Sequence, residues 1–305
     1  MAKTVSVSDF LSGEDVRRLQ RRSNLRASVM VAWTWALIAG AFALAIVYPN
    51  PLTILLAVLI LGGRQLALGI IVHDCAHNAM FTTRRMNELV GHWLAGAPMN
   101  IPLAVYRDYH LKHHRYAGTP DDPDIVFVHK YPISRASLKR KFMRDLTGRT
   151  GVRDTLGKLK SFKLAKNYPW LLFHVGLLAV LAAVGAPWAY GLWWAAELFA
   201  YPAIVRLRQI GEHGVAPNRT SLDPRDNTST TLAPWWQRLF VAPNHVHYHL
   251  EHHLMSGVPP YRLRDAHRLL AARGFHDDHA CVANGYGDVL RRAVRADGSG
   301  DAMAV

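Results

Sequence analysis

The chain has 305 residues, half of them apolar, and its 36 Lys and Arg against 22 Asp and Glu give a formal net charge of +14. Long apolar runs together with a strong basic excess favour a membrane protein with a basic cytoplasmic face over a soluble enzyme. A nucleic-acid-binding protein would share the charge but not the apolar runs, and the chain has no recognised nucleic-acid motif, so nucleic acid is not expected as a partner.

The first apolar region follows a basic N-terminal segment, residues 1–26, which carries no evident removable signal peptide. Residues 27–48 are uncharged and would form a helix about 33 Å long, enough to cross a bilayer. After the break at 49–51 a second apolar run returns as far as residue 72, interrupted by Arg64 and Gln65. We expect residues 27–72 to form a transmembrane hairpin in which Arg64 snorkels to the interface.

Residues 73–168 are expected to form a cytoplasmic and interfacial cap. The apolar stretch 89–105 contains Pro98 and Pro102, which argue against a spanning helix and favour an interfacial or re-entrant segment. Residues 135–166 hold eleven Lys or Arg. This segment is predicted to be either an amphipathic helix lying on anionic headgroups or a solvated charged loop.

A second hairpin is predicted for residues 169–207, with its turn at 185–187 and Glu197 as the charged residue of the returning run. Glu197 would act on the substrate, pair with a neighbouring helix, or lie near the outer interface within the aromatic belt. Residues 208–292 would complete the cap, and 293–305 would be a disordered tail. The positive-inside rule then places both termini and the cap in the cytoplasm. The predicted fold is an all-α integral membrane protein with four transmembrane helices in two hairpins and a cytoplasmic helical cap.

Histidines cluster beside the ends of the apolar runs, at positions that share one helix face when spaced i, i+3 and i+4. Eight imidazoles are too many for a single metal ion, so the pattern predicts a site for two transition metals in the cap. A zinc site is a weaker interpretation, because zinc needs only three or four protein ligands. Cys75 lies within the first cluster and is interpreted as a small packing residue. The clustered residues are His73, His77, His110, His113, His114, His249, His252 and His253.

These clusters and their surroundings resemble the membrane fatty acid desaturase superfamily, which includes related lipid and carotenoid hydroxylases and ketolases. The resemblance covers roughly residues 50–270 and includes the run from His110 to Asp124 and the stretch from Asn244 to Pro260. It implies that the histidines hold two iron ions on the cytoplasmic face above four membrane helices, with O₂ as co-substrate. It also implies a ninth ligand, His213, just after the fourth helix.

Several polar residues beside the clusters could accept the second ring N–H of a ligand histidine and fix its tautomer. Gln209 would either reach the metals through water or pack between helices. His245 and His247 would either bind metal or, as we favour, have a supporting or structural role. The acidic candidates are Asp74, Asp121, Asp122, Asp124, Glu212 and Glu251. The remaining histidines lack cluster spacing and are interpreted as ordinary residues: His92, His129, His174, His267, His276 and His279.

The resemblance implies an O₂-dependent fatty acid (acyl lipid) desaturase in a bacterial-type cytoplasmic membrane. No haem-binding or Cys-rich electron-transfer module is present. A separate donor, a ferredoxin or cytochrome with its reductase, would therefore supply electrons and be steered by the basic surface. The alternatives are a hydroxylase, ketolase or oxidative decarboxylase on the same metal core, a membrane metal transporter, and a zinc membrane hydrolase. The sequence leaves open the acyl length, the double-bond position, the head group and the oligomeric state.

Overall fold

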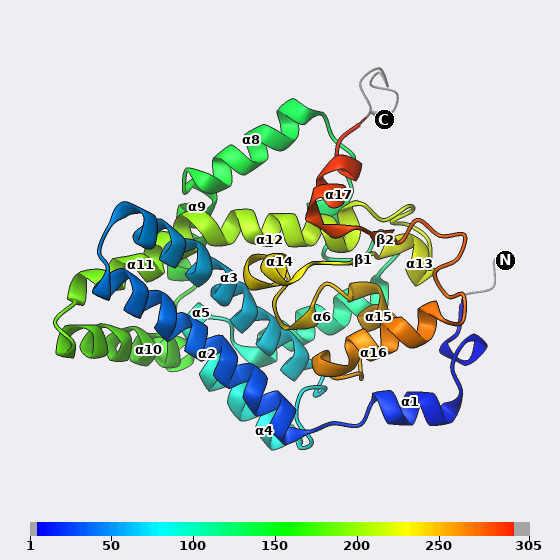
Figure 1. Cartoon of the computed structure of the whole chain (residues 1–305), viewed down its shortest axis with the longest axis horizontal. Coiled ribbons are helices and arrows are strands. Elements are labelled where there is room, and N and C mark those ends of the chain that lie inside the picture. The colour runs from blue at the N-terminus through cyan, green and yellow to red at the C-terminus, as the bar shows by residue number, and fades with distance from the viewer. Residues whose placement is uncertain (1–4, 296–305) are drawn as a thin grey trace.

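The computed structural model describes residues 5–295 and is largely helical (Figure 1). Within this part of the chain, three helices are long and apolar enough to cross a membrane. They are α2 (Asn24–Val47), α3 (Pro51–Ala76) and α10 (Leu164–Ala183).

The reversal between α2 and α3 is built by local capping. The Asn50 side chain accepts hydrogen bonds from the backbone N–H groups of Leu52 and Thr53, both at 3.1 Å, and Pro51 is the first residue of α3. Pro is favoured at that position because its fixed φ suits a helix and its missing N–H is not needed there. The chain therefore turns back sharply, as the Pro-Asn-Pro sequence predicts.

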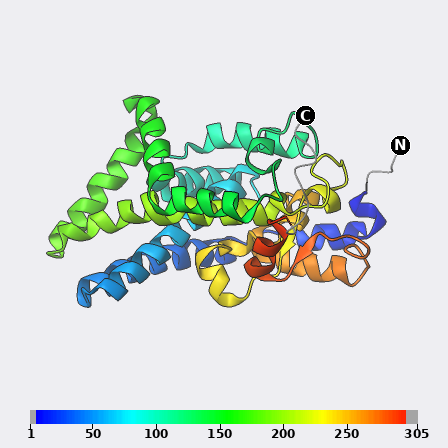
Figure 2. The same cartoon turned by 90° about the horizontal axis from the view of Figure 1, so that it is seen from above.

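The predicted fourth span does not appear as one regular α-helix. After α10 and the short η3 (Pro187–Ala189), the helical path alternates between α-helical and π-helical geometry. Its parts are α11 (Tyr190–Ala195), the π-helix η4 (Ala196–Ala200), α12 (Tyr201–Gln209) and the π-helix η5 (Ile210–Gly214). In Figures 1 and 2 the turn after α2 and the turn after α10 lie at the same end of the molecule, on the left of both views.

Arg64 does not snorkel through lipid, so that prediction is wrong. Only 3% of the residue is exposed, and its guanidinium donates to backbone carbonyls of α14 (Trp235–Phe240). Gly63 explains the close approach, because a Cβ at this position would lie 2.7 Å from the Phe240 carbonyl oxygen. The middle of α3 is thus covered by protein where the sequence suggested exposure.

The apolar stretch 89–105 folds back against α3. It contains α4 (Arg84–Leu89), the π-helix η2 (Val90–Gly96) and the short α5 (Ala97–Met99), and the chain then reverses at Asn100, whose φ is 52°. Cys75 is fully buried in the same core, with Gly91 beside it, which fits its interpretation as a packing residue.

The basic segment 135–166 is helical, forming α8 (Arg135–Leu146) and α9 (Arg149–Lys160). Ion pairs join both helices to the helical path that follows α10. The fully buried Asp145 pairs with Arg206, and the Lys158 ammonium lies 2.8 Å from the Glu197 carboxylate. Glu197 therefore pairs with a neighbouring helix, which is one of the three roles expected for it.

The remaining elements make up most of the cap, on the right of Figure 1. The two strands pair in parallel, with Thr230 opposite Val282. The elements are η1 (Val7–Asp9), α1 (Gly13–Leu19), α6 (Leu103–Tyr116), α7 (Ile125–Val128), α13 (Pro224–Asn227), β1 (Thr230–Thr231), η6 (Pro243–His245), α15 (His249–Leu254), α16 (Pro260–Ala271), β2 (Val282–Ala283) and α17 (Gly285–Arg292). Val294, in the predicted tail, bridges to Ile133, whereas 296–305 lie outside the described residues.

Substituting Gly62 with Ala should destabilise the protein, because α3 and η4 touch there. An added Cβ would lie 2.8 Å from the Ala200 Cβ, and overpacking of this kind costs about 1–3 kcal/mol. Gly69→Ala is the matched control in the same helix, since a Cβ there meets nothing within 4 Å and should stabilise by up to about 1 kcal/mol. Thermal unfolding in detergent measures both; equal midpoints for the two variants would contradict the contact.

Candidate metal centre

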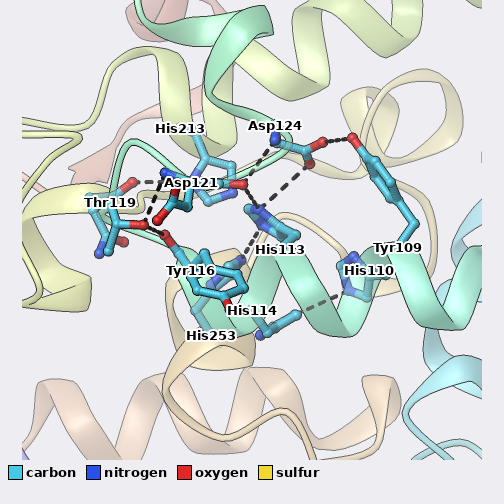
Figure 3. A network of polar contacts seen from close by, with 12 residues as sticks. Tyr109, His110, His113, His114, Tyr116, Thr119, Asp121, Asp124, His213 and His253 are labelled. Carbon is cyan, nitrogen blue, oxygen red and sulfur yellow. Dashed lines mark hydrogen bonds and ion pairs between the residues drawn. The ribbon is translucent and has the colours of Figure 1, made fainter.

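Helix α6 supplies three imidazoles from one face. His110, His113 and His114 stand at i, i+3 and i+4, so their side chains project to the same side of the helix. Figure 3 shows them from close by, with His213 and His253 approaching from other parts of the chain. The short α15 presents His249, His252 and His253 with the same spacing.

The nine histidines proposed as ligands fall into two groups, in each of which one nitrogen per ring lies within 4.8 Å of the others. We call them set A and set B. Set A contains His73, His77, His110, His114 and His252, and set B contains His113, His213, His249 and His253. The sets adjoin, because the rings of His114 in set A and His253 in set B stack with centroids 4.2 Å apart. The structure thus brings all nine predicted residues together, including His213, which lies in η5.

The spacing of the ring nitrogens fits metal binding. In set A the Nε2 atoms of His110 and His252 lie 3.1 and 3.0 Å from His114 Nε2. In set B the His249 Nε2 atom lies 3.0 Å from His213 Nε2 and 3.2 Å from His253 Nε2. Two nitrogens bound at about 2.1 Å and at right angles on one ion lie about 3.0 Å apart. The donor sets therefore fit two transition-metal ions.

Set A also contains polar atoms that the protein leaves without partners. The Nε2 atoms of His73 and His77 are buried and make no hydrogen bond. Buried polar atoms are nearly always satisfied, so two such atoms in one cluster point to a bound ion. Imidazole nitrogens suit iron, copper, zinc and nickel.

The second ring nitrogen of several of these histidines is held by the protein. His73 Nδ1 lies 2.8 Å from the Asp74 carboxylate, and His113 Nδ1 lies 2.7 Å from that of Asp122. His213 Nδ1 lies 3.1 Å from the Asn227 carbonyl oxygen. Such contacts leave Nε2 with its lone pair facing the set.

Burial keeps most of these imidazoles neutral. Burial and the neighbouring imidazoles lower the pKa of His114 to about 2, and burial with His113 lowers the pKa of His213 to about 3. His113 differs: burial lowers its pKa, but the hydrogen bond to Asp122 and the charge of Asp124 outweigh burial and raise it. Neutral rings are the form that binds metal, so the cluster is prepared for ions at neutral pH.

The other predicted acidic partners differ in their contacts. Asp124 accepts a hydrogen bond from the Tyr109 hydroxyl and lies 3.8 Å from His113 Nδ1 (Figure 3). Within residues 5–295, the exposed Asp121 makes no hydrogen bond or ion pair with any of the nine histidines. Glu212 pairs with Arg208 at 2.6 Å and lies 3.5 Å from His249 Nδ1. Burial raises the pKa of Glu212 to about 7, against the opposing charge of Arg208.

A cavity of about 40 Å³ adjoins both sets. Its wall includes His110 from set A and His213 from set B, together with Gln209, Tyr106 and Arg208. Such a space holds a water or a molecule of similar size. Gln209 thus lies beside both sets, as one of its two predicted roles requires. Arg208 was missed, although its place four residues before Glu212 is the spacing of a helical ion pair.

Glu251 does not contact a ligand histidine, so its predicted role as a direct support is wrong. It is fully buried on α15 and receives hydrogen bonds from three other groups. His267 Nδ1 lies 2.6 Å and His276 Nε2 lies 2.9 Å from its carboxylate, and the Thr230 hydroxyl donates as well. Burial raises its pKa, but the bonds from His267 and His276 prevail and lower it to about 2.

His267 and His276, which were predicted to be ordinary residues, thus hold a buried carboxylate. Their separation along the chain gives no local signal, because they meet Glu251 only through folding of α16 and the segment after it. His245 and His247 lie outside both sets. The other four unclustered histidines make separate contacts, such as His174 with the Tyr190 hydroxyl at 2.9 Å and His279 with Asp226 at 3.1 Å.

The chain belongs to the fatty acid desaturase family, whose model matches residues 49–280. This confirms the family resemblance inferred from the histidine clusters. The family joins oxidoreductases of related chemistry, and the apolar helices and histidine sets described above agree with it.

Several relatives match most of the chain. The dihydrorhizobitoxine desaturase of Bradyrhizobium elkanii is 26% identical over 82% of this chain and 76% of its own length. An sn-1 oleoyl-lipid 12-desaturase of Picosynechococcus is 26% identical over 80% of this chain and 76% of its own. A beta-carotene ketolase of Paracoccus is 29% identical over 78% of this chain and 89% of its own.

Metal uptake should follow the division into two sets. We expect iron-free protein, prepared anaerobically, to bind about two equivalents of Fe²⁺. His110→Ala in set A and His249→Ala in set B should each bind about one equivalent less. His129→Ala is the control, because His129 is exposed and bonds only the Ile125 carbonyl. Metal analysis after gel filtration measures the uptake; unchanged binding in both set variants would contradict the assignment.

Glu251→Ala should destabilise the protein and loosen α15. The change leaves His267 and His276 without their acceptor in a buried site, which costs about 2–4 kcal/mol of unfolding free energy. Asp277→Ala, at an exposed neighbouring position, should change it by less than about 0.5 kcal/mol. Thermal unfolding of iron-free protein checks this, and Fe²⁺ uptake should fall in the Glu251 variant alone. An unaltered midpoint would show that the three contacts are dispensable.

Proposed function

We propose that this protein is a membrane-bound, O₂-dependent non-haem di-iron oxidase that acts on an acyl chain. The observation that carries the proposal is the division of nine histidines, six buried and three partly buried, into adjoining sets of five and four. Two iron ions, when bound, would activate O₂ for removal of hydrogen from an unactivated C–H bond. A transporter is less well supported, because the nine histidines form one cluster and do not line a path through the apolar helices.

The protein's own residues would tune that chemistry. Neutral imidazoles leave more positive charge on the ions than carboxylates would, which favours a strong oxidant. Asp74 and Asp122 would orient His73 and His113 through their Nδ1 atoms. The small cavity beside Gln209 and Glu212 would admit O₂-sized molecules to the junction of the sets.

Desaturation is the reaction we favour. Two of the relatives described above are named as desaturases, and one of them is named for an oleoyl lipid. In this reaction a second hydrogen is removed from the neighbouring carbon, so the acyl chain gains a double bond.

Ketolation or hydroxylation is the second candidate, because the ketolase relative is matched over 89% of its length. The same histidine sets would serve either outcome. The fate of the substrate radical separates them: loss of a second hydrogen gives an alkene, and capture of oxygen gives an alcohol. A second O₂-dependent oxidation at the same carbon would turn that alcohol into a ketone. Oxidative decarboxylation would use the same core.

The membrane arrangement and the electron donor are also proposals. We propose two transmembrane hairpins, at 27–72 and 169–207, with the termini and the metal centre in the cytoplasm of a bacterial-type cell. The net charge of +14 supports this orientation and a separate acidic electron donor, a ferredoxin or a cytochrome with its reductase. An sn-1 acyl-lipid omega-3 desaturase of Nostoc, named with ferredoxin, is 23% identical over 66% of this chain.

Expression in a host of defined lipid composition tests the reaction. We expect a new unsaturated acyl lipid, located by mass-spectrometric double-bond mapping, and at least roughly a 100-fold loss of it in His113→Ala. His129→Ala should keep full activity, and both variants should remain folded and membrane-inserted. A hydroxylated or keto product would favour the second candidate. Full turnover by His113→Ala would contradict the metal-centre proposal.

A further inference from the structure

A groove of about 820 Å³ runs between α2, the middle of α3 and α14. One wall is the apolar face of α2, formed by Leu25, Val29, Met30, Trp33 and Leu37. That wall extends over about 18 Å, the rise of twelve helical residues, which suits much of an acyl chain. We call this feature the α2–α14 groove.

The opposite side of the groove carries positive charge. Arg64 and Arg238 line it, and Arg26 lies at the start of the apolar wall. Neither Arg64 nor Arg238 forms an ion pair with an acidic side chain within residues 5–295. Their Nε atoms are buried and make no hydrogen bond, as is also true of His245 Nδ1 in the same groove.

Such unpaired cations need a counter-charge. Only 3% of Arg64 is exposed, and its Nη2 has only the carbonyl oxygens of Arg238 and Leu239 as partners. Buried charges in proteins are normally paired. Two guanidiniums that face one groove without a carboxylate therefore indicate a bound anion, for which a phosphate group has the matching geometry.

Exposed tryptophans along the groove favour a position at the membrane surface. Trp33 is 61% exposed and Trp235 72% exposed, and both line the groove; Trp236 beside them is 51% exposed. Tryptophan gathers where the acyl chains meet the headgroups. A groove with two exposed tryptophans therefore suits a lipid whose headgroup meets Arg64 and Arg238 and whose chain follows the apolar wall.

From these observations we propose that the α2–α14 groove binds an anionic phospholipid. Its phosphate would lie between Arg64 and Arg238, and one acyl chain would follow the apolar wall of α2. This binding site is separate from the two histidine sets and does not depend on the proposed oxidase reaction.

The occupant would touch the segment that leads to the last histidine cluster. Asn244 and His245, in the groove, have left-handed backbone with φ of 54° and 61°, and Asn244 Nδ2 donates to the Ala67 carbonyl at 3.2 Å. His249, a member of set B, follows four residues later. A lipid bound here would therefore steady the entry to α15.

Native mass spectrometry of the full chain in detergent tests the proposal, with phosphatidylglycerol and phosphatidylcholine of identical acyl chains as probes. We expect phosphatidylglycerol to bind about tenfold more tightly, since each nearby arginine contributes several-fold to the attraction of an anionic lipid. Arg238→Gln should abolish that preference. Arg22→Gln is the control, because Arg22 is exposed and does not line the groove.

Arg64→Gln should lose the preference in the same way as Arg238→Gln. A thermal unfolding scan shows whether the Arg64 variant folds, and if it does not fold, Arg238→Gln alone decides the test. Equal affinity for the two lipids, or an equal loss in Arg22→Gln, would overturn the proposal. Displacement by millimolar inorganic phosphate would assign the site to a free anion, and displacement by oleate at equal concentration would assign it to a carboxylate; either result overturns the phospholipid. Because binding is measured without iron or turnover, failure here leaves the oxidase proposal untouched.

Discussion

The structure depends on holding nine imidazoles together, away from water and mostly uncharged. Each ring brings two polar nitrogens into the interior, and each must find a partner for the fold to be stable. The protein holds Nδ1 in several rings through Asp74, Asp122 or the Asn227 carbonyl, and directs Nε2 inward. The nitrogens that remain without a partner face one shared space, which is the space that a metal ion fills. The cluster is thus a polar core completed by its cofactor.

The need to hold these imidazoles in place explains why α15, a helix of only six residues, is anchored on both faces. Helix α15 turns His249, His252 and His253 toward the sets, while Glu251 points to the other side. There the carboxylate is held by imidazoles from α16 and from the following segment and by the β1 hydroxyl of Thr230. So short a helix is not stable alone. The buried carboxylate network supplies the rigidity that local hydrogen bonding cannot.

The parts that could be predicted are those set by local spacing. The i, i+3, i+4 pattern identifies the imidazoles of α6 and α15 because one helix turn is enough to bring them to one face. Apolar length likewise identifies α2, α3 and α10. The parts that could not be predicted arise from contacts between distant segments. Arg64 looks like a lipid-facing charge until α14 covers it, and His267 looks isolated until α16 packs beside α15.

The π-helical turns show the same limit in its sharpest form. A hydropathy pattern reads residues 188–205 as an ordinary returning helix, since composition carries no trace of one extra residue per turn. Yet η5 brings His213 Nε2 to 3.0 Å from His249 Nε2. Gly211 in the same turn leaves room for α17, because a Cβ at position 211 would lie only 3.1 Å from the Tyr286 ring. Turns of this kind are uncommon and occur often at functional sites, because they redirect one side chain without ending the helix. His213 thus reaches set B because the helix departs from regular α-helical geometry at η5. The reason for that departure lies in how α12, α15 and α17 pack together, and the local sequence does not reveal it.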